Sequence, residues 1–288
     1  MRLITPTPDT AARRERLREL LRGYGSVAIG YSGGVDSVFL ARIAVDVLGA
    51  TNVLAVTGKS DSIASWMEDT AREVAQRFGI PWLEVETREM EDPRYAANPS
   101  NRCYFCKSEL WSRLGEVARE RGLSVVADGS NADDVGDHRP GAVAAGENAV
   151  RSPLLEAGLT KDEIRAWSRE LGLPTWDQPA APCLASRLPY GLAVTPRRLR
   201  QVEEAEVALR ALGFRDFRVR HHGEVARLEV HPAEAGRVAA ERVRIDQAVR
   251  GAGFRRALLD LQGYRRGALN EGLGEGEMVR LVQIGSAA

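Results

Sequence analysis

Four short apolar segments of strand type alternate with longer helical segments over the first 130 residues of the chain. The strand-type segments are 26–31, 52–56, 82–85 and 124–127, and the helical segments are 13–22, 37–48, 62–78 and 106–121. Gly49, Gly79 and Gly122 follow three of these helical segments, a position where glycine often ends a helix. Long helices between successive strands are the crossover connections of a parallel sheet. The pattern therefore predicts an α/β fold, a doubly wound parallel sheet with helices on both faces.

The pattern changes after a proline-rich segment, residues 174–189, which contains Cys183. Before it, Thr160 and Glu163 form a capping box that opens a helix. After it, we expect a helix, a hairpin, a second helix and a last strand, at 195–212, 214–221 with 225–230, 232–250 and 257–261. The sequence therefore predicts two domains, a doubly wound domain of residues 1–185 and a smaller α+β domain of residues 190–288.

Charge and composition exclude several classes of protein. The 40 basic residues balance 40 acidic residues, whereas a nucleic-acid-binding platform is usually strongly basic. No apolar run is long enough to span a membrane, and the first 22 residues lack the apolar core of a secretory signal. Three cysteines are too few for a disulfide framework and favour metal binding or reactive thiols. We therefore expect a cytoplasmic protein with neither a nucleic-acid nor a membrane partner.

The most informative segment is Ser-Gly-Gly-Val-Asp-Ser at residues 32–37, directly between the first strand and its helix. Its glycines let the backbone approach a phosphate, and its serines and the helix start provide hydrogen-bond donors. Because an aspartate repels phosphate, Asp36 is expected to hold Mg²⁺ or to brace the loop. The segment is neither a Walker A loop nor G-x-G-x-x-G. It resembles the PP-loop of ATP pyrophosphatases, which cleave ATP between the α and β phosphates. The candidate nucleotide-binding residues are Ser32, Gly33, Gly34, Asp36 and Ser37.

A second polar segment, residues 128–134, follows the fourth strand-type segment and should lie at the same edge of the sheet. It resembles the Gly-Ser/Thr-Asn-x-x-Asp segment of PP-loop enzymes. That resemblance implies that Asn131 and Asp134 help to bind nucleotide and metal. An ordinary polar loop is the alternative.

The three cysteines lie in two short segments. Cys103 and Cys106 form a C-x-x-C at a helix start, which lowers a thiol pKa, and Cys183 lies in Pro-Cys-Leu-Ala-Ser-Arg. With the PP-loop, these segments resemble the LarE family of sulfur transferases, and the resemblance extends to residues 218–223 and 260–264. LarE proteins act in assembly of the nickel-pincer nucleotide cofactor of lactate racemase. They adenylylate the carboxylates of pyridinium-3,5-biscarboxylic acid mononucleotide and convert them to thiocarboxylates.

This resemblance implies ATP and Mg²⁺ as cofactors, the pyridinium mononucleotide as substrate, and sulfide or another sulfur donor as partner. One LarE branch sacrifices the sulfur of a single cysteine. The other holds a 4Fe-4S cluster on three cysteines with one iron open, and Cys103, Cys106 and Cys183 match that branch. The alternatives are a sacrificial or persulfide role for Cys183, a zinc site with His138, and ordinary buried cysteines.

An anionic substrate also needs fixed positive charge. Arg218 and Arg220 alternate on the expected hairpin, so both should project to one face, where guanidinium groups suit a phosphate or carboxylate. A solvated sheet edge is the alternative for these two arginines. Ser186 and Arg187 are further candidates because they neighbour Cys183. Glu206 resembles a family residue near the phosphate site, with a surface charge as the alternative.

These patterns together predict an ATP-dependent sulfurtransferase that releases AMP and pyrophosphate and acts as a homo-oligomer on a small molecule. Two other PP-loop reactions compete with this interpretation. The first, thiolation of tRNA, is disfavoured by the neutral net charge of the chain. The second, amidation of a nucleotide precursor, needs no group of cysteines. A nucleotide-binding regulatory module without turnover is the rival from a different class.

Overall fold

The computed structural model describes residues 8–135, 140–265 and 269. The chain divides into two compact units. The first contains residues 1–60, 65–89 and 103–181, and the second contains residues 61–64, 90–102 and 182–288. Two early segments thus group with the late part of the chain. The two domains expected at residues 1–185 and 190–288 stay a prediction.

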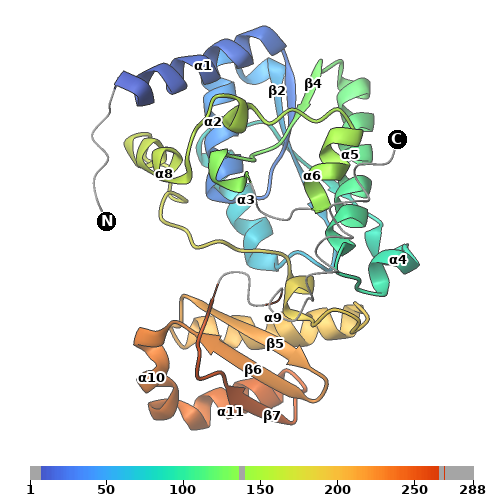
Figure 1. The fold of residues 1–288 in the computed structure, drawn as a ribbon, viewed down its shortest axis with the longest axis vertical. Helices are drawn as coiled ribbons and strands as arrows, with labels where there is room; N and C mark the ends of the chain where they lie inside the picture. The colour runs from blue at the N-terminus through green and yellow to red at the C-terminus, as the bar shows by residue number, and fades with distance from the viewer. Residues whose placement is uncertain (1–7, 136–139, 266–268, 270–288) are drawn as a thin grey trace. The chain divides into compact units, whose positions relative to one another are not determined.

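The first unit is built on a four-stranded parallel sheet in the order β3-β2-β1-β4 (Figure 1). The strands are β1 (Val27–Gly30), β2 (Val53–Lys59), β3 (Trp82–Glu86) and β4 (Val125–Ala127). In the middle of the sheet, Val27 of β1 lies in register with Val53 on one side and Val125 on the other. This arrangement confirms the predicted parallel sheet. Because β1 lies between β2 and β4, the strand order reverses at the carboxyl ends of β1 and β4, where open α/β sheets bind ligands.

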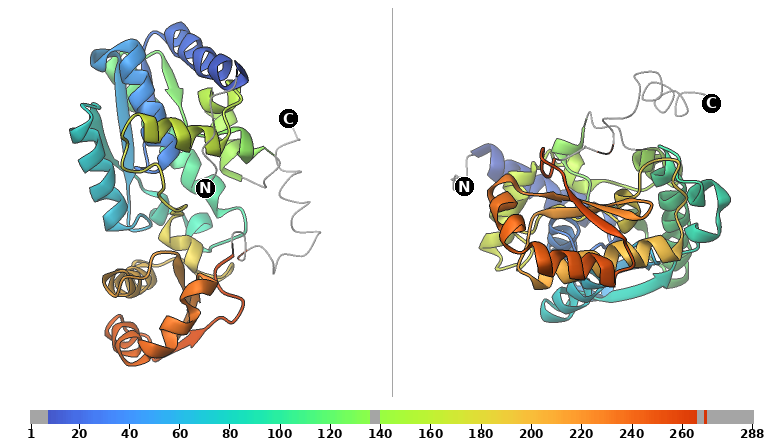
Figure 2. Two further views of the ribbon diagram at one scale, coloured as in Figure 1. Left: turned by 90° about the vertical axis from the view of Figure 1, so that its left-hand side faces the viewer. Right: turned by 90° about the horizontal axis from the view of Figure 1, so that it is seen from below.

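Helices cover both faces of this sheet (Figures 1 and 2). The alternation of side chains along β2 shows how. Val53 and Ala55 belong to a core that also includes residues of α1, α2 and α8, whereas Leu54 and Val56 pack with α5 and α6. The doubly wound arrangement is therefore confirmed. The helices of this unit are α1 (Pro8–Tyr24), α2 (Val35–Leu48), η1 (Ala50–Asn52), α3 (Ser65–Arg77), α5 (Arg102–Arg121), η3 (Ala132–Asp134), α6 (Pro140–Glu147), α7 (Pro153–Glu156) and α8 (Lys161–Glu170).

The second unit is built on a three-stranded sheet in the order β5-β6-β7. β5 (Phe217–His222) and β6 (Val225–Val230) form the predicted antiparallel hairpin, which turns at Gly223 with a φ of 66°. β7 (Arg256–Leu259) pairs with β6 in parallel. The helices that lie wholly or mostly in this unit are η2 (Glu89–Glu91), α4 (Pro93–Ala96), η4 (Leu184–Arg187), α9 (Pro196–Ala211), η5 (Pro232–Glu234), α10 (Ala235–Ala240) and α11 (Arg242–Gly251).

The prediction of one helix over residues 232–250 was wrong. Glu241, with φ −91° and ψ 9°, closes α10 and begins α11, and it separates the two helices. Neither proline nor glycine stands at the break, so the sequence contains no local signal for it.

Hydrogen bonds attach the two early segments to the rest of the second unit. The amide of Leu184 donates to Ser62 O at 2.7 Å, and the amide of Val194 donates to Ala96 O at 2.8 Å. Asn98 is fully buried, and its Nδ2 donates to the carbonyl oxygens of Pro189 and Leu192, each at 2.8 Å. Residues 90–102 are therefore held by backbone groups that lie about 90 positions later in the chain.

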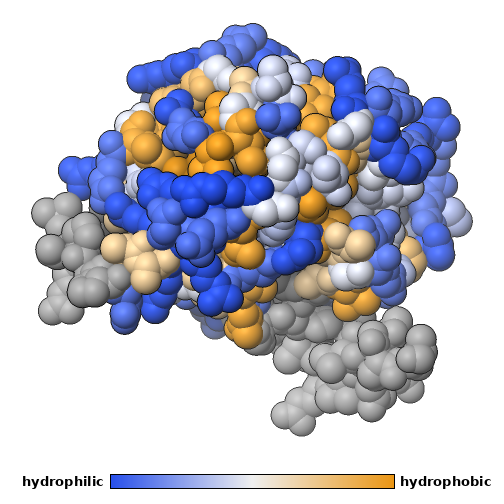
Figure 3. Space-filling view, turned by 90° about the horizontal axis from the view of Figure 1, so that it is seen from above, coloured by the Kyte–Doolittle hydropathy of each residue, from blue (hydrophilic) through white to orange (hydrophobic). Residues whose placement is uncertain are grey.

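No helix within the described ranges is long and apolar enough to cross a membrane. The face drawn in Figure 3 mixes hydrophilic and hydrophobic residues, with hydrophilic side chains along much of its edge.

Candidate active site

The loop between β1 and α2 has the backbone geometry that an anion site requires. Gly33 has a φ of 72°, and a Cβ at this position would lie 3.0 Å from backbone and side-chain atoms of Ala71 on α3. Gly34 is the N-cap of α2 and has no side chain to bond the first N–H groups of the helix. The hydroxyl oxygens of Ser32 and Ser37 lie 3.2 Å apart, and the Ser37 hydroxyl donates to Gly34 O at 3.2 Å. The loop thus supports itself and presents a helix N-terminus, where anions bind.

The second polar segment, residues 128–134, lies directly against this loop. A Cβ on Gly129 would come within 3.2 Å of the Asp36 Cβ and the Ser37 amide nitrogen. Asn131 Nδ2 donates to Asp36 Oδ1 at 3.4 Å, and the Asn131 amide donates to Asp134 Oδ2 at 3.1 Å. The structure therefore brings the sequence-predicted residues of both segments together at the point where the strand order reverses.

Lys161 joins these two segments, although the sequence analysis did not select it. Its Nζ donates to Asp36 Oδ2, and its amide donates to Asp133 Oδ2 at 2.7 Å. Burial raises the pKa of Asp36, and the charge of Lys161 opposes that shift. Lys161 is the first residue of α8 and one of only three lysines in the chain, the others being Lys59 and Lys107. That scarcity beside 37 arginines is the one sequence signal that could have singled it out.

The carboxylates here fit a magnesium ion that arrives with a nucleotide. Within the described residues, no group of three or more His, Cys, Asp or Glu side chains is arranged to hold a metal ion. Mg²⁺ usually keeps several waters and binds one or two carboxylates together with substrate phosphates. Asp36 and Asp134 can supply such carboxylates, because both border the phosphate loop.

The cysteines are distributed over both units. Cys103 and Cys106 lie in the first two turns of α5, in the first unit, as the sequence predicted. Cys183 is the N-cap of η4, in the second unit. All three are thiols, with Cys103 exposed and the other two half-buried. Thiolates are the usual ligands of iron–sulfur clusters, so the donor type fits a cluster. A site made of all three stays a prediction, and His138 of the zinc alternative lies outside the described residues.

Arg187 and Glu206 form a buried ion pair beside Cys183. Arg187 Nε lies 2.8 Å from Glu206 Oε1, and its NH2 group donates to Oε2 at 2.9 Å. The NH1 group of Arg187 donates to Pro182 O at 2.6 Å, to Cys183 O at 3.1 Å and to the Ser186 hydroxyl at 3.0 Å. Arg187 therefore fixes the backbone that carries Cys183. The alternative of a surface charge for Glu206 was wrong, since Glu206 is 2% exposed.

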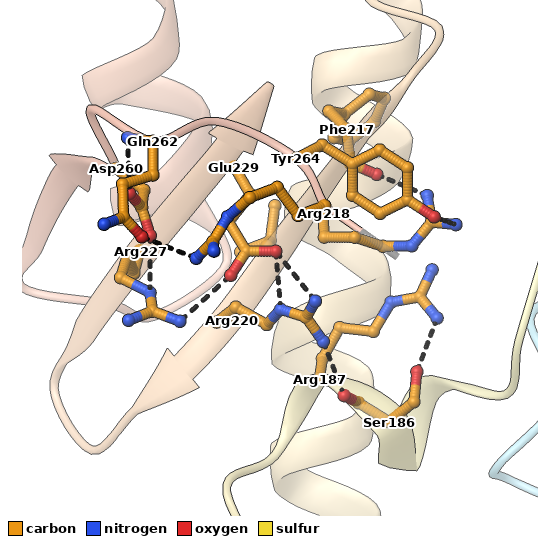
Figure 4. A network of polar contacts seen from close by, with 12 residues as sticks. Ser186, Arg187, Phe217, Arg218, Arg220, Arg227, Glu229, Asp260, Gln262 and Tyr264 are labelled. Atoms are coloured by element: carbon orange, nitrogen blue, oxygen red, sulfur yellow. Dashed lines mark hydrogen bonds and ion pairs between the residues drawn. The ribbon is translucent and has the colours of Figure 1, made fainter. Parts of the chain in front are cut away.

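Arg218 and Arg220 project from the same face of β5, as predicted (Figure 4). Both are buried, so the alternative of a solvated sheet edge was wrong. Arg220 pairs with Glu229 on β6 and donates to Ser186 O at 2.8 Å. Arg218 stacks over the ring of Tyr264 at 4.6 Å.

Burial lowers the pKa of Arg218, and the nearby charge of Arg187 lowers it further. A buried cation under this repulsion is stabilised by an incoming anion. The arginine cluster, comprising Arg187, Arg218 and Arg220, is therefore suited to an anionic ligand. Glu229 pairs with Arg220 of the cluster and with Arg227, and it was missed because a single glutamate on an alternating strand looks like any exposed charge.

Comparison with known proteins places the chain in a family. The NAD synthase family model matches residues 12–115, which contain the phosphate loop. An uncharacterised protein of Synechocystis sp. is 44% identical, over 90% of this chain and 97% of that protein. Pyridinium-3,5-bisthiocarboxylic acid mononucleotide synthase of Lactiplantibacillus plantarum, a LarE protein, is 34% identical over 93% of this chain and 97% of that protein. The chain belongs to the LarE family.

The LarE relationship covers parts of both units, because it extends over nearly the whole chain. The match to other PP-loop enzymes is shorter. The tRNA-specific 2-thiouridylase MnmA of Azorhizobium caulinodans is 34% identical, over 53% of this chain and 48% of that protein. The arginine cluster lies beyond the residues that the NAD synthase model matches.

Proposed function

We propose that this LarE protein is an ATP-dependent sulfur transferase. Its substrate is pyridinium-3,5-biscarboxylic acid mononucleotide, whose carboxylates it adenylylates and converts to thiocarboxylates for the nickel-pincer cofactor of lactate racemase. The observation that carries the proposal is a phosphate loop without a Walker lysine in a chain related over 93% of its length to the bisthiocarboxylic acid mononucleotide synthase. Such a loop suits cleavage of ATP between the α and β phosphates.

The reaction has two balanced steps for each carboxylate. First, a carboxylate oxygen attacks the α-phosphorus of ATP; the P–O bond to the β-phosphate breaks, and pyrophosphate leaves with the electron pair. Second, a sulfide-level sulfur attacks the carbonyl carbon of the acyl-adenylate; a C–S bond forms, the C–O bond breaks, and AMP leaves. AMP is a good leaving group, so the adenylate makes the second step accessible.

The residues of the first unit have distinct roles in the first step. The N–H groups at the start of α2 and the hydroxyls of Ser32 and Ser37 bind phosphate oxygens, and the glycines allow close approach. Asp36 and Asp134 bind Mg²⁺, and Asn131 orients Asp36. Oriented donors of this kind stabilise the negative charge that develops on the α-phosphate and on the leaving pyrophosphate.

The arginine cluster of the second unit binds the substrate phosphate or carboxylates. Arg187, Arg218 and Arg220 supply the positive charge, and Ser186 and Glu206 hold the first of these guanidinium groups in place. Bidentate guanidinium groups match the planar geometry of carboxylate and phosphate oxygens.

The sulfur comes from a site that includes the three cysteines. Cys103, Cys106 and Cys183 would hold a 4Fe-4S cluster, which would supply sulfide-level sulfur for the second step. The protein would then use sulfide or another sulfur donor for repeated turnover. The alternative is a sacrificial Cys183, which loses its own sulfur once. A cytoplasmic location and assembly into a homo-oligomer belong to this proposal.

The test incubates the anaerobic protein with MgATP, sulfide and pyridinium-3,5-biscarboxylic acid mononucleotide, and identifies products by mass spectrometry. We expect AMP, pyrophosphate and a mononucleotide in which oxygen is replaced by sulfur. Asp36→Ala should abolish all three, because the loop then lacks its magnesium ligand. ADP and orthophosphate as products would refute the PP-loop mechanism. Sulfur that entered tRNA but not the mononucleotide would favour the thiolation reaction instead.

A further inference from the structure

The guanidinium groups of the arginine cluster are held in two different ways (Figure 4). Arg187 and Arg220 are each paired with a buried glutamate, and all their guanidinium nitrogens contact protein oxygens. Arg218 instead lies with its Cζ 4.6 Å from the centre of the Tyr264 ring. A carboxylate partner uses the N–H groups of a guanidinium, whereas an aromatic ring holds the group by its face and does not use them.

Tyr264 reaches Arg218 because the chain turns back across the sheet after β7. Arg218 lies on β5, β6 stands between β5 and β7, and Tyr264 follows β7. The Gly263 amide donates to Asp260 O at 3.1 Å, and the Tyr264 amide donates to Val230 O, at the end of β6, at 2.9 Å. Gly263 has a φ of 70°, and a Cβ there would lie 2.8 Å from Val230 O. The crossing therefore requires glycine and fixes the residue that follows it.

The ring of Tyr264 contributes more to this contact than its hydroxyl does. The NH2 group of Arg218 donates to the Tyr264 hydroxyl at 3.3 Å, which is longer than the usual N–H···O distance of about 2.9 Å. The ring, by contrast, lies well within the limit of about 6 Å for a cation–π contact. Arg218 is 6% exposed, and such contacts are strongest where water is excluded.

Arg218 needs support from outside its own strand if it is to wait in place for a ligand. An arginine has a long side chain, and restricting it in advance lowers the cost of binding. The NH1 group of Arg218 donates to Phe217 O at 2.6 Å, a bond to the neighbouring residue of β5. The charge of Arg187 repels that of Arg218. Tyr264 supplies an attractive contact from a different part of the chain, and this contact opposes the repulsion.

We propose that Tyr264 is a positioning residue for substrate binding. Its ring holds the guanidinium of Arg218 by the face before the substrate arrives, and the N–H groups of Arg218 then bind an anionic oxygen group of the substrate. Tyr264 acts through Arg218 and takes no part in the adenylylation itself. The inference rests on the proposed function, because it uses the arginine cluster as the anion site of the mononucleotide.

The test measures binding of pyridinium-3,5-biscarboxylic acid mononucleotide to the full chain by calorimetry. Tyr264→Leu should weaken this binding about tenfold, the amount that a desolvated cation–π contact contributes to an affinity. Tyr264→Phe keeps the ring and should bind within about twofold of the wild type. Unchanged affinity in Tyr264→Leu would overturn the proposal, and so would equal losses in Tyr264→Leu and Tyr264→Phe, because the hydroxyl would then be responsible.

Steady-state assays of AMP formation provide a second measurement. Tyr264→Leu should raise the KM for the mononucleotide, with kcat and the KM for ATP within about twofold of the wild type, because only substrate binding is weakened. A loss confined to kcat would contradict a positioning role in binding. Tyr264→Met fills more of the volume of the ring and gives the same prediction if Tyr264→Leu fails to fold.

A double-mutant cycle separates this role from a purely structural one. In the Arg218→Ala background, Tyr264→Leu should change the mononucleotide affinity by less than about twofold, because the group that Tyr264 positions is gone. A residue that only supported the fold would cost the same affinity in both backgrounds. Equal losses in the two backgrounds would therefore refute the inference.

Phe78→Leu is the matched control, since it removes a ring that also lies near arginines, Arg42 at 5.9 Å and Arg77 at 5.5 Å. It should leave the mononucleotide affinity within about twofold, and a tenfold loss would count against the proposal because any lost ring would then have the same effect. Wild-type protein that bound no mononucleotide would refute the proposed function itself. Mononucleotide binding that did not depend on Tyr264 would refute this inference alone.

Discussion

At the scale of single residues, backbone conformation decides which side chains the phosphate loop accepts. Gly33 and Gly34 are neighbours in sequence but differ in what they require. Gly33 has a positive φ and no room for a Cβ, whereas Gly34 has a φ of −80°, and a Cβ there would meet Ser32 Oγ at 3.3 Å. Gly33 therefore requires glycine itself, whereas Gly34 requires only a small residue.

Gly33→Ala should destabilise the protein by about 1–2 kcal/mol, because a Cβ disfavours the left-handed backbone by that amount. The contact with Ala71 on α3 adds to this cost. Urea unfolding of the two single variants measures the difference. Gly34→Ala is the matched control and should lose less than half as much. Equal losses would show that the positive φ of Gly33 does not govern the loop.

His221 makes stability depend on pH. Burial lowers its pKa to about 4, and its Nδ1 makes no hydrogen bond within the described residues. In the unfolded chain the pKa is about 6.5, so between pH 6.5 and pH 4 the unfolded state binds more protons. Stability from this group is therefore present above pH 6.5 and is lost as the pH falls toward 4.

The free energy of unfolding of the wild type should fall by about 2 kcal/mol more than that of His221→Leu between pH 7.5 and pH 4.5. Urea titrations of both proteins at the two pH values measure this difference. Parallel losses in wild type and variant would show that His221 is protonated as easily in the folded protein as in the unfolded chain.

At the scale of elements, one buried carboxylate connects three parts of the second unit. Glu206 on α9 binds Arg187 of η4 and accepts a hydrogen bond from the amide of Val219 on β5 at 3.1 Å. Removing one partner of a buried pair leaves the other charged and without water. The position of η4, and with it the backbone at Cys183, therefore depends on Glu206.

Glu206→Ala should lower the free energy of unfolding by about 3 kcal/mol or more, because it strands the Arg187 guanidinium. Combining it with Arg187→Leu should recover part of that loss. Asp246→Ala removes the exposed partner of Arg250 on α11 and should cost less than about 0.5 kcal/mol. Chemical denaturation of the four proteins provides the comparison. A Glu206→Ala cost no larger than that of Asp246→Ala would contradict the structural role of the pair.

The sequence predicted elements well where periodicity and end signals coincide. The helix before Gly49 and the helix opened by Thr160 and Glu163 begin or end within two residues of their predicted bounds. It did not predict α6, whose eight residues include two glycines and whose Ala144 and Ala145 belong to an apolar cluster with residues of α5. Local signals were absent there, and tertiary packing stabilises the helix.

The same limit applies to the candidate site. Contiguous motifs identified the phosphate loop and the cysteines, because their chemistry is written in adjacent residues. Partners that meet only in space could not be predicted. Lys161 is 125 residues from Asp36, and Glu229 contacts Arg220 only because the hairpin folds back. The environment of the arginines could not be predicted either. Arg187 and Arg220 are each paired with a buried glutamate, where solvent was the alternative for a charged side chain.

At the scale of the whole molecule, the sulfur site that we propose uses all three cysteines of the chain. Cys103 and Cys106 lie in α5, and Cys183 is the N-cap of η4. A cluster with one open iron reacts readily with oxygen, so protein purified in air should be colourless.

Anaerobic reconstitution with iron and sulfide should give brown protein with about four irons per chain. Each single Cys→Ala variant should lose both the colour and repeated turnover, because three thiolates are needed to leave one iron open. Iron analysis and absorbance measure the cluster, and the amount of product formed per enzyme molecule measures repeated turnover. Loss of one sulfur from Cys183 in the intact mass after one turnover, with Cys103→Ala fully active, would instead establish the sacrificial mechanism.

The hydrogen bonds of Asn98 also determine the order in which a ribosome can complete the second unit. Its carbonyl partner at Pro189 is synthesised 91 positions later, a delay of roughly 5 to 18 s at the usual rates of translation. All four strands of the parallel sheet have emerged by then, since β4 ends at Ala127. A nascent chain therefore presents residues 90–102 to chaperones and proteases for seconds after the first sheet is available, whereas in the finished protein Asn98 is buried.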